Sequence, residues 1–334
     1  MKRRSAEDYR IQLIARLLTI VVCLGLLLGC AWWLDSRTRR QETRGDYRKR
    51  YAYDNVIEID GVSYRQRKEL TTVLLMGVDQ DSDAEITGFR SGGQADFLRL
   101  IIIDPRNRVV SQLALDRDTM TPIKVLGVLG SSSGMRSLQL CLSHGYGDGK
   151  EQSCANTVDA VSNFLLGTQI THFAAVNLDG IGALNDWAGG VTVTLEDDFS
   201  RTDPAMTPGR TLTLNARQAE VYVRERMDVG DGTNAARMNR QNVYLHELSD
   251  RVGERLRESK DEISGLIDVL TPYIVTDFSR GRLINEAWAA REYEFRDAVE
   301  IPGTHRIGED GFVEFHADEE ALQRIVLELF YTEV

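Results

Sequence analysis

Histidine and cysteine are scarce in this 334-residue sequence, and neither forms a recognisable catalytic or metal-binding pattern. The five histidines lack metal-ligand spacing, and no serine–histidine or cysteine–histidine pair stands out as a nucleophile with its base. They are His144, His172, His246, His305 and His316. Only His144 lies beside a glycine-rich loop, and we expect it to be structural. The sequence therefore gives no support to a zinc site or a hydrolytic triad.

A net positive charge is found only in the first 50 residues, and the rest of the chain is strongly acidic. The net charge is −11, and residues 1–50 carry 12 Lys and Arg against five Asp and Glu, which leaves −18 for the other 284 residues. A general nucleic-acid binder needs a broad basic face, so this composition argues against that class. With 42% hydrophobic residues and six prolines, the chain can bury a sizeable core. Any anion site on it must be local.

An uncharged run near the N-terminus predicts a membrane-spanning helix. Residues 17–34 hold no charge, and as a helix they span about 27 Å, close to the hydrocarbon thickness of a bilayer. Trp32 and Trp33 stand where interfacial aromatic side chains are common. A cleaved signal peptide and lipid attachment at Cys30 are the alternatives. Five Lys and Arg precede the run and seven follow it, so their count does not set the orientation.

The rest of the chain reads as one domain behind a linker. We predict a basic tail over 1–16, the membrane helix over 17–34, a charged stalk over 35–69 and a single domain over 70–334, with order beginning at Thr71. No internal repeat divides that domain.

Hydrophobic patterning and turn residues place strands and helices alternately along this domain. Strands are predicted at 71–79, 97–104, 108–115, 171–178, 191–195, 294–301 and 311–316. Helices are predicted at 156–167, 179–187, 215–226, 235–257, 261–271, 281–292 and 317–331, with Asn156, Asn215 and Asn234 as N-terminal caps. The alternation predicts an α/β fold with a mixed sheet.

Two of the four cysteines, Cys141 and Cys154, bracket a polar glycine-rich loop. This arrangement suits a disulfide in an oxidising compartment. The alternative is a pair of buried thiols.

Three aspartates stand at strand ends. Asp79 ends the first predicted strand, Asp96 opens the second, and Asp118 follows the third beside Arg117. Carboxylates at strand ends converge at one rim of a sheet, where α/β folds bind their ligands. A hard cation such as Mg²⁺ is held by one or two carboxylates together with substrate phosphates. The alternative is ordinary turn chemistry, because aspartate is common after a strand.

Arginines gather in the stretch 222-YVRERMDVGDGTNAARMNRQNVY-244. Arg237, Arg240 and Gln241 share one helix face near the helix N-terminus, which favours anions. Arg224 and Arg226 alternate by two and point the same way if the segment is extended. Arginine forks grip phosphate oxygens, so the cluster predicts a multiply charged anion such as pyrophosphate. The alternative is a solvated helix whose arginines pair with Glu225, Asp228 and Asp231.

An acidic rim that binds metal and an arginine cradle together describe phosphoryl-transfer machinery. Several stretches, in order, resemble the LytR-CpsA-Psr family over about residues 70–250. They are 74-LLMGVD-79, 95-ADFLRLIIIDP-105, 113-LALDRDT-119, 172-HFAAVNLDGIGALNDWAGGVTV-193, 217-RQAEVYVRER-226 and 237-RMNRQ-241. Each motif alone is weak, but the ordered set is specific.

The resemblance implies a phosphotransferase that moves a glycopolymer from an undecaprenyl diphosphate carrier to peptidoglycan. The polymer would be a teichoic acid or a capsular or other wall polysaccharide, and the acceptor the C6 hydroxyl of N-acetylmuramic acid. It also implies an α/β/α sandwich with an apolar pocket for the lipid, a cytoplasmic N-terminus, a single membrane span and an extracytoplasmic catalytic domain. Pyrophosphatase activity on polyprenyl diphosphates is a related expectation. A non-catalytic, membrane-tethered binder of polyprenyl phosphates, or a scaffold for wall assembly, is the alternative.

The same resemblance assigns roles to residues of this chain. Asp79 and Asp96 would hold Mg²⁺, and Arg117 would contact the diphosphate with Asp118 positioning it or supporting the metal. The diphosphate site would be lined by Arg117, Arg224, Arg226, Arg237, Arg240 and Gln241. The catalytic group would comprise Asp96, Arg117, Asp118 and Arg226.

Three departures from the family pattern stand out. Gln80 and Asp81 follow the first aspartate where the family often has arginine, and Leu115-Asp116 precede Arg117 where Ile-Pro is commoner. Asn234 stands where aspartate is common, three residues before Arg237.

The change at position 234 removes one negative charge near the arginines, which we expect to alter anion binding without abolishing it. We therefore expect Asn234→Asp to keep transfer activity within about tenfold, or roughly 1.4 kcal/mol, of the natural chain in a steady-state assay. Complete loss of activity would contradict this expectation.

Overall fold

The computed structural model describes residues 55–334, apart from 80–91, 128–129, 178, 226–228 and 231–233 and several side chains of the helix 234–258. The chain divides into two units, Met1–Asp54 and Asn55–Val334, and all described elements belong to the second. The predicted basic tail and membrane helix lie outside the described residues. Within the described residues, no helix combines the length and apolarity needed to cross a bilayer.

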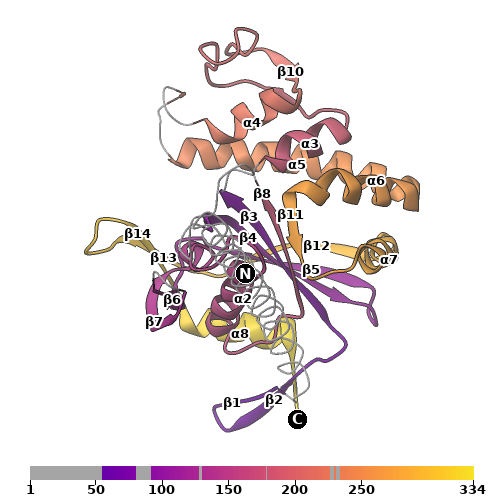
Figure 1. The fold of residues 1–334 in the computed structure, drawn as a ribbon. Coiled ribbons are helices and arrows are strands. Elements are labelled where there is room, and N and C mark those ends of the chain that lie inside the picture. The colour runs from indigo at the N-terminus through magenta and orange to yellow at the C-terminus, as the bar shows by residue number, and fades with distance from the viewer. Residues whose placement is uncertain (1–54, 80–91, 128–129, 178, 226–228, 231–233) are drawn as a thin grey trace, which may run out of the picture. The chain divides into compact units, whose positions relative to one another are not determined.

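A six-stranded mixed sheet forms the centre of the fold (Figure 1). Its strands in spatial order are β11 (Ile274–Thr276), β8 (His172–Asn177), β3 (Thr71–Asp79), β4 (Gln94–Asp104), β5 (Val109–Leu115) and β12 (Glu294–Glu300). The β8–β3 and β5–β12 pairs are parallel, and the other three pairs are antiparallel. The predicted mixed α/β class is confirmed, and residues beyond 260 supply both edge strands.

Alternation along the central strands builds the core. In β3, Leu74 and Met76 are fully buried, as is Leu100 in β4, whereas the intervening Arg99 and Ile101 are only partly buried. The period of two sends these two sets of side chains to opposite faces. Figure 1 shows α2 (Glu151–Phe164) and α8 (Glu319–Phe330) on one side of the sheet and α7 (Arg280–Ala290) on the other.

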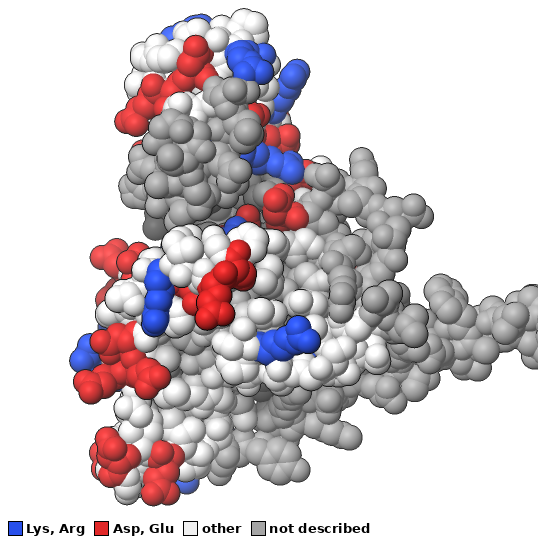
Figure 2. Space-filling model, turned by 90° about the vertical axis from the view of Figure 1, so that its left-hand side faces the viewer, with Lys and Arg blue, Asp and Glu red and all other residues white. Residues whose placement is uncertain are grey.

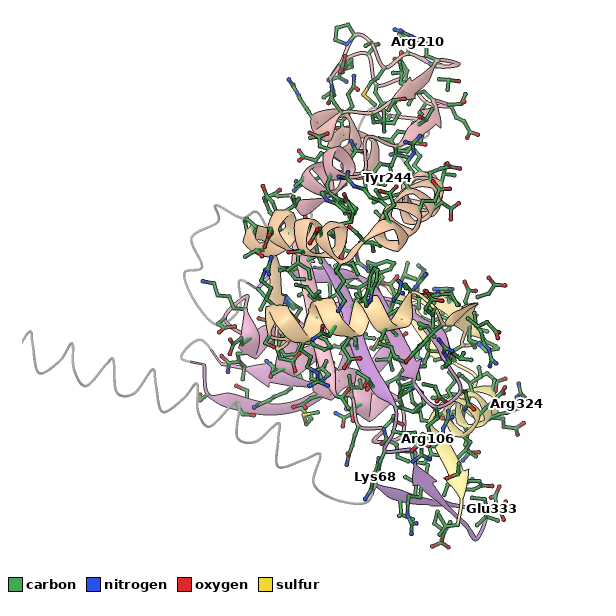
Figure 3. The ribbon with its side chains drawn as sticks, turned by 90° about the vertical axis from the view of Figure 1, so that its right-hand side faces the viewer. Lys68, Arg106, Arg210, Tyr244, Arg324 and Glu333 are labelled. Carbon is green, nitrogen blue, oxygen red and sulfur yellow. The ribbon has the colours of Figure 1, made fainter. Side chains whose placement is uncertain are left out.

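The remaining helices follow the predicted pattern closely. They are α3 (Gly180–Trp187), α4 (Ala216–Arg224), α5 (Asn234–Glu258) and α6 (Lys260–Leu270). Asn215 caps α4 as expected, because its side chain accepts a hydrogen bond from the Gln218 amide while the Gln218 side chain accepts one from the Asn215 amide. Side chains of β9 (Thr192–Thr194), α4 and α5 form a second apolar core that contains Phe199 and Tyr244 (Figure 3).

Helix α2 begins earlier than predicted. Asn156 is not its cap, because the Asp148 carboxylate accepts hydrogen bonds from the amides of Lys150, Gln152 and Ser153 and so satisfies the first turn at Glu151. Asn156 is buried within the helix, and its side chain donates to the carbonyl of Tyr146.

The described part of the folded unit already includes strands before Thr71, so the boundary predicted at Thr71 is wrong. Strands β1 (Val56–Ile59) and β2 (Val62–Gln66) form a small sheet with β15 (Tyr331–Glu333) at the other end of the chain. The side chain of Asn55 donates a hydrogen bond to the Tyr331 hydroxyl at 3.1 Å. The later part of the predicted stalk is thus part of the folded unit.

Three hairpins complete the fold. Strands β6 (Met120–Leu126) and β7 (Ser132–Gln139) form one, and a short helix, η1 (Leu140–Ser143), follows them. Strand β9 pairs with β10 (Thr211–Thr213), and β13 (Gly303–Ile307) pairs with β14 (Val313–Ala317). A second short helix, η2 (Thr271–Tyr273), precedes β11.

Candidate functional site

Asp79 and Asp96 stand at the same end of the β3–β4 pair, beside an irregularity in its register. Gly77 pairs with Phe97 and Val78 pairs with Ala95, which leaves Asp96 as the extra residue of a bulge. At this end of the sheet Asp79 ends β3, and the Asp96 side chain meets Arg117. Gly77 suits this position, because a Cβ there would lie 3.0 Å from that of Phe97.

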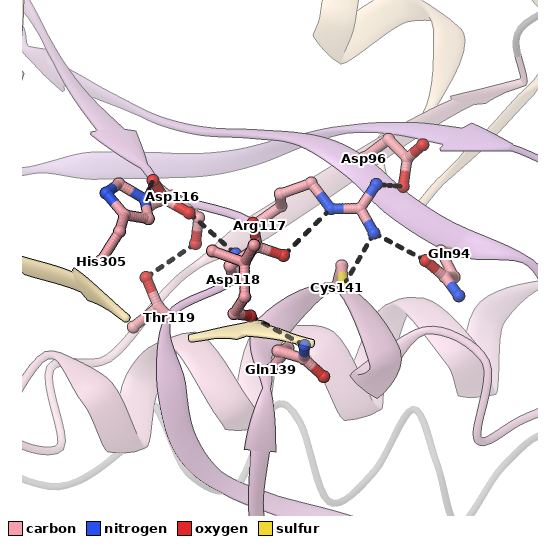
Figure 4. Close-up of polar contacts among 10 residues, drawn as sticks. Gln94, Asp96, Asp116, Arg117, Asp118, Thr119, Gln139, Cys141 and His305 are labelled. Carbon is pink, nitrogen blue, oxygen red and sulfur yellow. Dashed lines mark hydrogen bonds and ion pairs between the residues drawn. The ribbon is translucent and has the colours of Figure 1, made fainter. Parts of the chain in front are cut away.

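Arg117 links three segments of the site. Its Nη1 donates to Asp96 Oδ1 at 2.5 Å and its Nη2 to Gln94 Oε1 at 2.7 Å, and its Nε lies 3.4 Å from Asp118 Oδ1 (Figure 4). Its Nη2 also lies 3.4 Å from the Cys141 sulfur. The Arg117 side chain keeps 26% of its surface exposed, so it is both oriented and reachable by a ligand.

Burial raises the pKa values of two side chains next to Arg117. The pKa of Asp118 is raised, chiefly by burial, although Arg117 opposes this shift. Burial also raises the pKa of the Cys141 thiol to about 11, again against the pull of Arg117. Cys141 is therefore a neutral hydrogen-bond partner of Arg117 at neutral pH.

The disulfide expected between Cys141 and Cys154 is absent, and both residues are buried free thiols. Cys141 lies on η1 and meets Arg117, whereas Cys154 lies in α2 with its sulfur 3.9 Å from His144 Nε2. Each sulfur therefore has its own partner. His144 is buried, donates to the carbonyl of Gly92 at 2.5 Å and has its pKa lowered mainly by burial, which agrees with the structural role expected for it.

These thiols give a direct test. In a Cys23→Ser, Cys30→Ser variant, a thiol reagent should titrate two cysteines in denaturant without any reductant. In the native protein both should react slowly near pH 8, because burial raises both pKa values and little thiolate is present. Finding no titratable thiol in denaturant would restore the disulfide.

Arg224 extends the site to Asp79 from the end of the predicted helix, so the extended conformation considered for Arg224 and Arg226 does not apply to Arg224. It is the last residue of α4; its Nη1 donates to Asp179 Oδ1 at 2.9 Å, and its Nη2 lies 3.9 Å from Asp79 Oδ1. A charged helix end and a strand end thus meet, with Asp179 fixing the guanidinium group.

Arg240 lies in the interior of the fold, with only 6% of its surface exposed. Its guanidinium donates to Asp197 Oδ2 at 2.8 Å, to the Tyr222 carbonyl at 3.3 Å and to the Glu225 carbonyl, and it lies 5.3 Å from the centre of the Phe199 ring. Its contacts hold the segment that follows α4. This placement favours a structural role for Arg240 over direct contact with a diphosphate.

Three other predicted residues fall outside what the structure describes. Arg226 lies in an undescribed segment, and Arg237 and Gln241 belong to α5 by their backbone while their side chains are not described. Their predicted roles stay predictions. On the face shown in Figure 2, the basic side chains of the described residues lie among acidic ones, in keeping with the acidic charge of the domain.

Sequence reasoning missed several partners of the site. Gln94 and Asp179 hold the guanidinium groups of Arg117 and Arg224, and Asp116 and His305 lie on the far side of Asp118 (Figure 4). Asp179 stands in the quoted stretch 172–193, which was a usable signal. Asp116 likewise stands in the quoted stretch 113–119. Gln94 and His305 had no such signal, because their roles depend on pairings between distant segments.

Asp79 and Asp96 supply carboxylate oxygens, the type of ligand that Mg²⁺ prefers. Asp79 lies opposite Gln94 in the β3–β4 ladder, two residues from Asp96, so two hard oxygen ligands stand at one rim. Among the described residues, no three His, Cys, Asp or Glu side chains gather as a complete metal site. Mg²⁺ commonly takes one or two carboxylates and completes its shell with phosphate and water.

This chain is similar in sequence to several named proteins. A polyisoprenyl-teichoic acid–peptidoglycan teichoic acid transferase TagU of Bacillus subtilis is 26% identical over 94% of both chains, and the cell wall biosynthesis protein LcpA of Corynebacterium glutamicum is 28% identical over 62% of this chain and 45% of its own.

Two solved structures share the fold. Protein gbs0355 of Streptococcus agalactiae aligns with a TM-score of 0.58 at 21% identity, over 78% of this chain and 87% of the other. A structure titled TagT bound to LI-WTA aligns at 0.53 and 18% identity, over 78% and 90%. The model of the LytR_cpsA_psr family matches residues 36–330, so this chain belongs to that family.

Proposed function

We propose that the protein transfers a glycopolymer from a polyprenyl diphosphate carrier to a hydroxyl of peptidoglycan. The observation that carries the proposal is the partly exposed Arg117, which Asp96, Gln94 and Asp118 hold near the end of the sheet where β3 ends at Asp79. The names of the curated relatives, which include teichoic acid transferases, support the substrate class.

The chemistry is an exchange at one phosphorus. The acceptor hydroxyl oxygen forms a bond to the phosphorus that carries the glycopolymer, and the bond from that phosphorus to the bridging oxygen breaks. Polyprenyl monophosphate leaves, and the hydroxyl proton passes to a base or to water. Negative charge grows on the leaving phosphate, and Arg117 and Arg224 are placed to stabilise it.

Asp79 and Asp96 would hold Mg²⁺, which when bound would neutralise diphosphate charge. Asp118 fixes the Nε side of the Arg117 guanidinium, and Asp179 does the same for Nη1 of Arg224. We also propose that residues 17–34 anchor the chain in the cell membrane, with the N-terminus cytoplasmic and the domain outside, which would keep the site near a lipid-linked donor.

The test uses the full chain in detergent with a polyprenyl diphosphate-linked glycopolymer, Mg²⁺ and peptidoglycan fragments, followed by mass spectrometry. Metal-dependent attachment of polymer phosphate to the fragments, lost in Asp96→Asn, would support the proposal. Binding of the donor without cleavage would replace it with a non-catalytic binder. Release of phosphate to water alone, with acceptor present, would replace it with a pyrophosphatase.

A further inference from the structure

The β13–β14 hairpin lies against the loop that carries Arg117. The Phe315 amide donates to the Asp118 carbonyl at 2.8 Å, and Thr119 forms a parallel bridge with Phe315. On the other side of this loop, the Gln139 side chain donates to the Val313 carbonyl at 2.9 Å (Figure 4). A segment far outside the motif-bearing region 70–250 therefore borders the site.

One side chain of this hairpin reaches into the loop. His305 Nε2 lies 2.9 Å from Asp116 Oδ2, and because an ionised carboxylate can only accept, His305 donates. Its ring centre lies 4.9 Å from that of Phe315, which fixes the ring plane. The His305 side chain is 54% exposed, so burial does not explain why it points at Asp116.

The Asp116 carboxylate connects His305 to the loop backbone. Its other carboxylate oxygen, Oδ1, accepts from the Asp118 amide at 2.8 Å, and its carbonyl accepts from the Thr119 hydroxyl at 2.7 Å. At the next residue, the Arg117 carbonyl accepts from the Cys141 amide at 2.9 Å. The turn that presents Arg117 and Asp118 is thus built around the Asp116 carboxylate, and His305 holds the oxygen that the turn does not use.

We propose that His305 is a positioning residue of the transfer site and acts through Asp116 to fix the loop that presents Arg117 and Asp118. The inference rests on the proposed function. Losing the His305 hydrogen bond frees the Asp116 carboxylate to rotate, which weakens its hold on the Asp118 amide. The Arg117 guanidinium then samples orientations away from the rim. Small misplacements of catalytic groups cost rate steeply.

The experiment compares His305→Ala, His305→Gln and a matched control, His316→Gln, in the full chain. His316 lies on the facing strand of the same hairpin and pairs with Glu314 at 2.8 Å. We expect His305→Ala to lower kcat by on the order of tenfold while the donor KM changes less. His305→Gln should recover most of that loss, because its side-chain amide can donate to Asp116. The His316 variant should match the natural chain.

A double mutant tests whether the effect of His305 depends on Asp116. If His305 acts through Asp116, adding His305→Ala to Asp116→Ala costs no further rate. Additive losses, unchanged activity in His305→Ala, or no recovery in His305→Gln would each overturn the inference.

A second readout does not depend on turnover. Amide hydrogen exchange of the peptide that contains Asp118 should be faster in His305→Ala than in the natural chain or in His316→Gln. If the natural chain transfers no polymer, the proposed function fails while this readout still decides the positioning role. Equal exchange in His305→Ala and the natural chain would overturn that role.

Discussion

Replacing Arg117 with alanine is expected to lower kcat/KM for transfer by about 10²–10³-fold. The substitution removes the guanidinium that joins Asp96, Gln94 and Asp118, and so leaves the carboxylates of Asp96 and Asp118 without their shared cation. Arg117→Lys should recover only a small part, because a compact ammonium group cannot reproduce the planar guanidinium fork, whose separate nitrogens reach Asp96, Gln94 and Asp118. Steady-state kinetics with the lipid-linked donor measure both effects.

The matched control is Arg106→Ala, at the opposite end of β4. Arg106 pairs with Glu69 at 3.3 Å and is 74% exposed, so it forms an ordinary surface ion pair (Figure 3). Its loss should leave the rate within about twofold, since exposed pairs contribute about 0–1 kcal/mol. Equal effects from the two substitutions would show that Arg117 has no special part in the reaction.

Replacing Arg240 with methionine should destabilise the domain by about 3–5 kcal/mol. Methionine fills much of the same volume but removes the partner of Asp197 and the donors to the carbonyls of Tyr222 and Glu225. Breaking a buried pair on one side leaves a charge without compensation, which costs more than the pair contributes. Urea unfolding at constant pH, followed by circular dichroism, gives the change in free energy of unfolding.

Arg210→Met serves as the comparison, since the Arg210 side chain is exposed and its hydrogen bond is to the Ala205 carbonyl (Figure 3). We expect a change within about 0.5 kcal/mol. If Arg240→Met unfolds like the natural chain yet loses activity, Arg240 has a functional role in place of a structural one.

Local patterns predicted most of the fold. Alternating apolar residues marked β3 and β5, and cap residues such as Asn215 marked helix starts, because these signals act within a few residues. The missed elements include β1 and β2, which pair with each other and gain their third strand, β15, from the other end of the chain. Their polar alternation resembles a solvated stalk until β15 is known to pair with them.

The sequence predicted the main charged residues of the candidate site but not the hydrogen bonds that connect them. Aspartates at strand ends and Arg117 follow from topology, which local patterning supplies. Gln94 and His305 gain their roles from a bulge and from a hairpin nearly 190 residues beyond Asp116, neither of which leaves a local signal. Arg240 shared its pattern with surface arginines, and only tertiary packing placed it inside.

The pairing of β2 with β15 also constrains the order in which the domain folds. Arg65 and Thr332, 267 residues apart in the chain, face each other in this ladder. At synthesis rates of about 5–20 residues per second, β1 and β2 wait roughly 10–50 s for their third strand. A two-stranded hairpin alone is marginally stable in water. The N-terminal edge of the domain therefore closes last, and until it does the chain carries an open strand edge that a chaperone or another chain can reach.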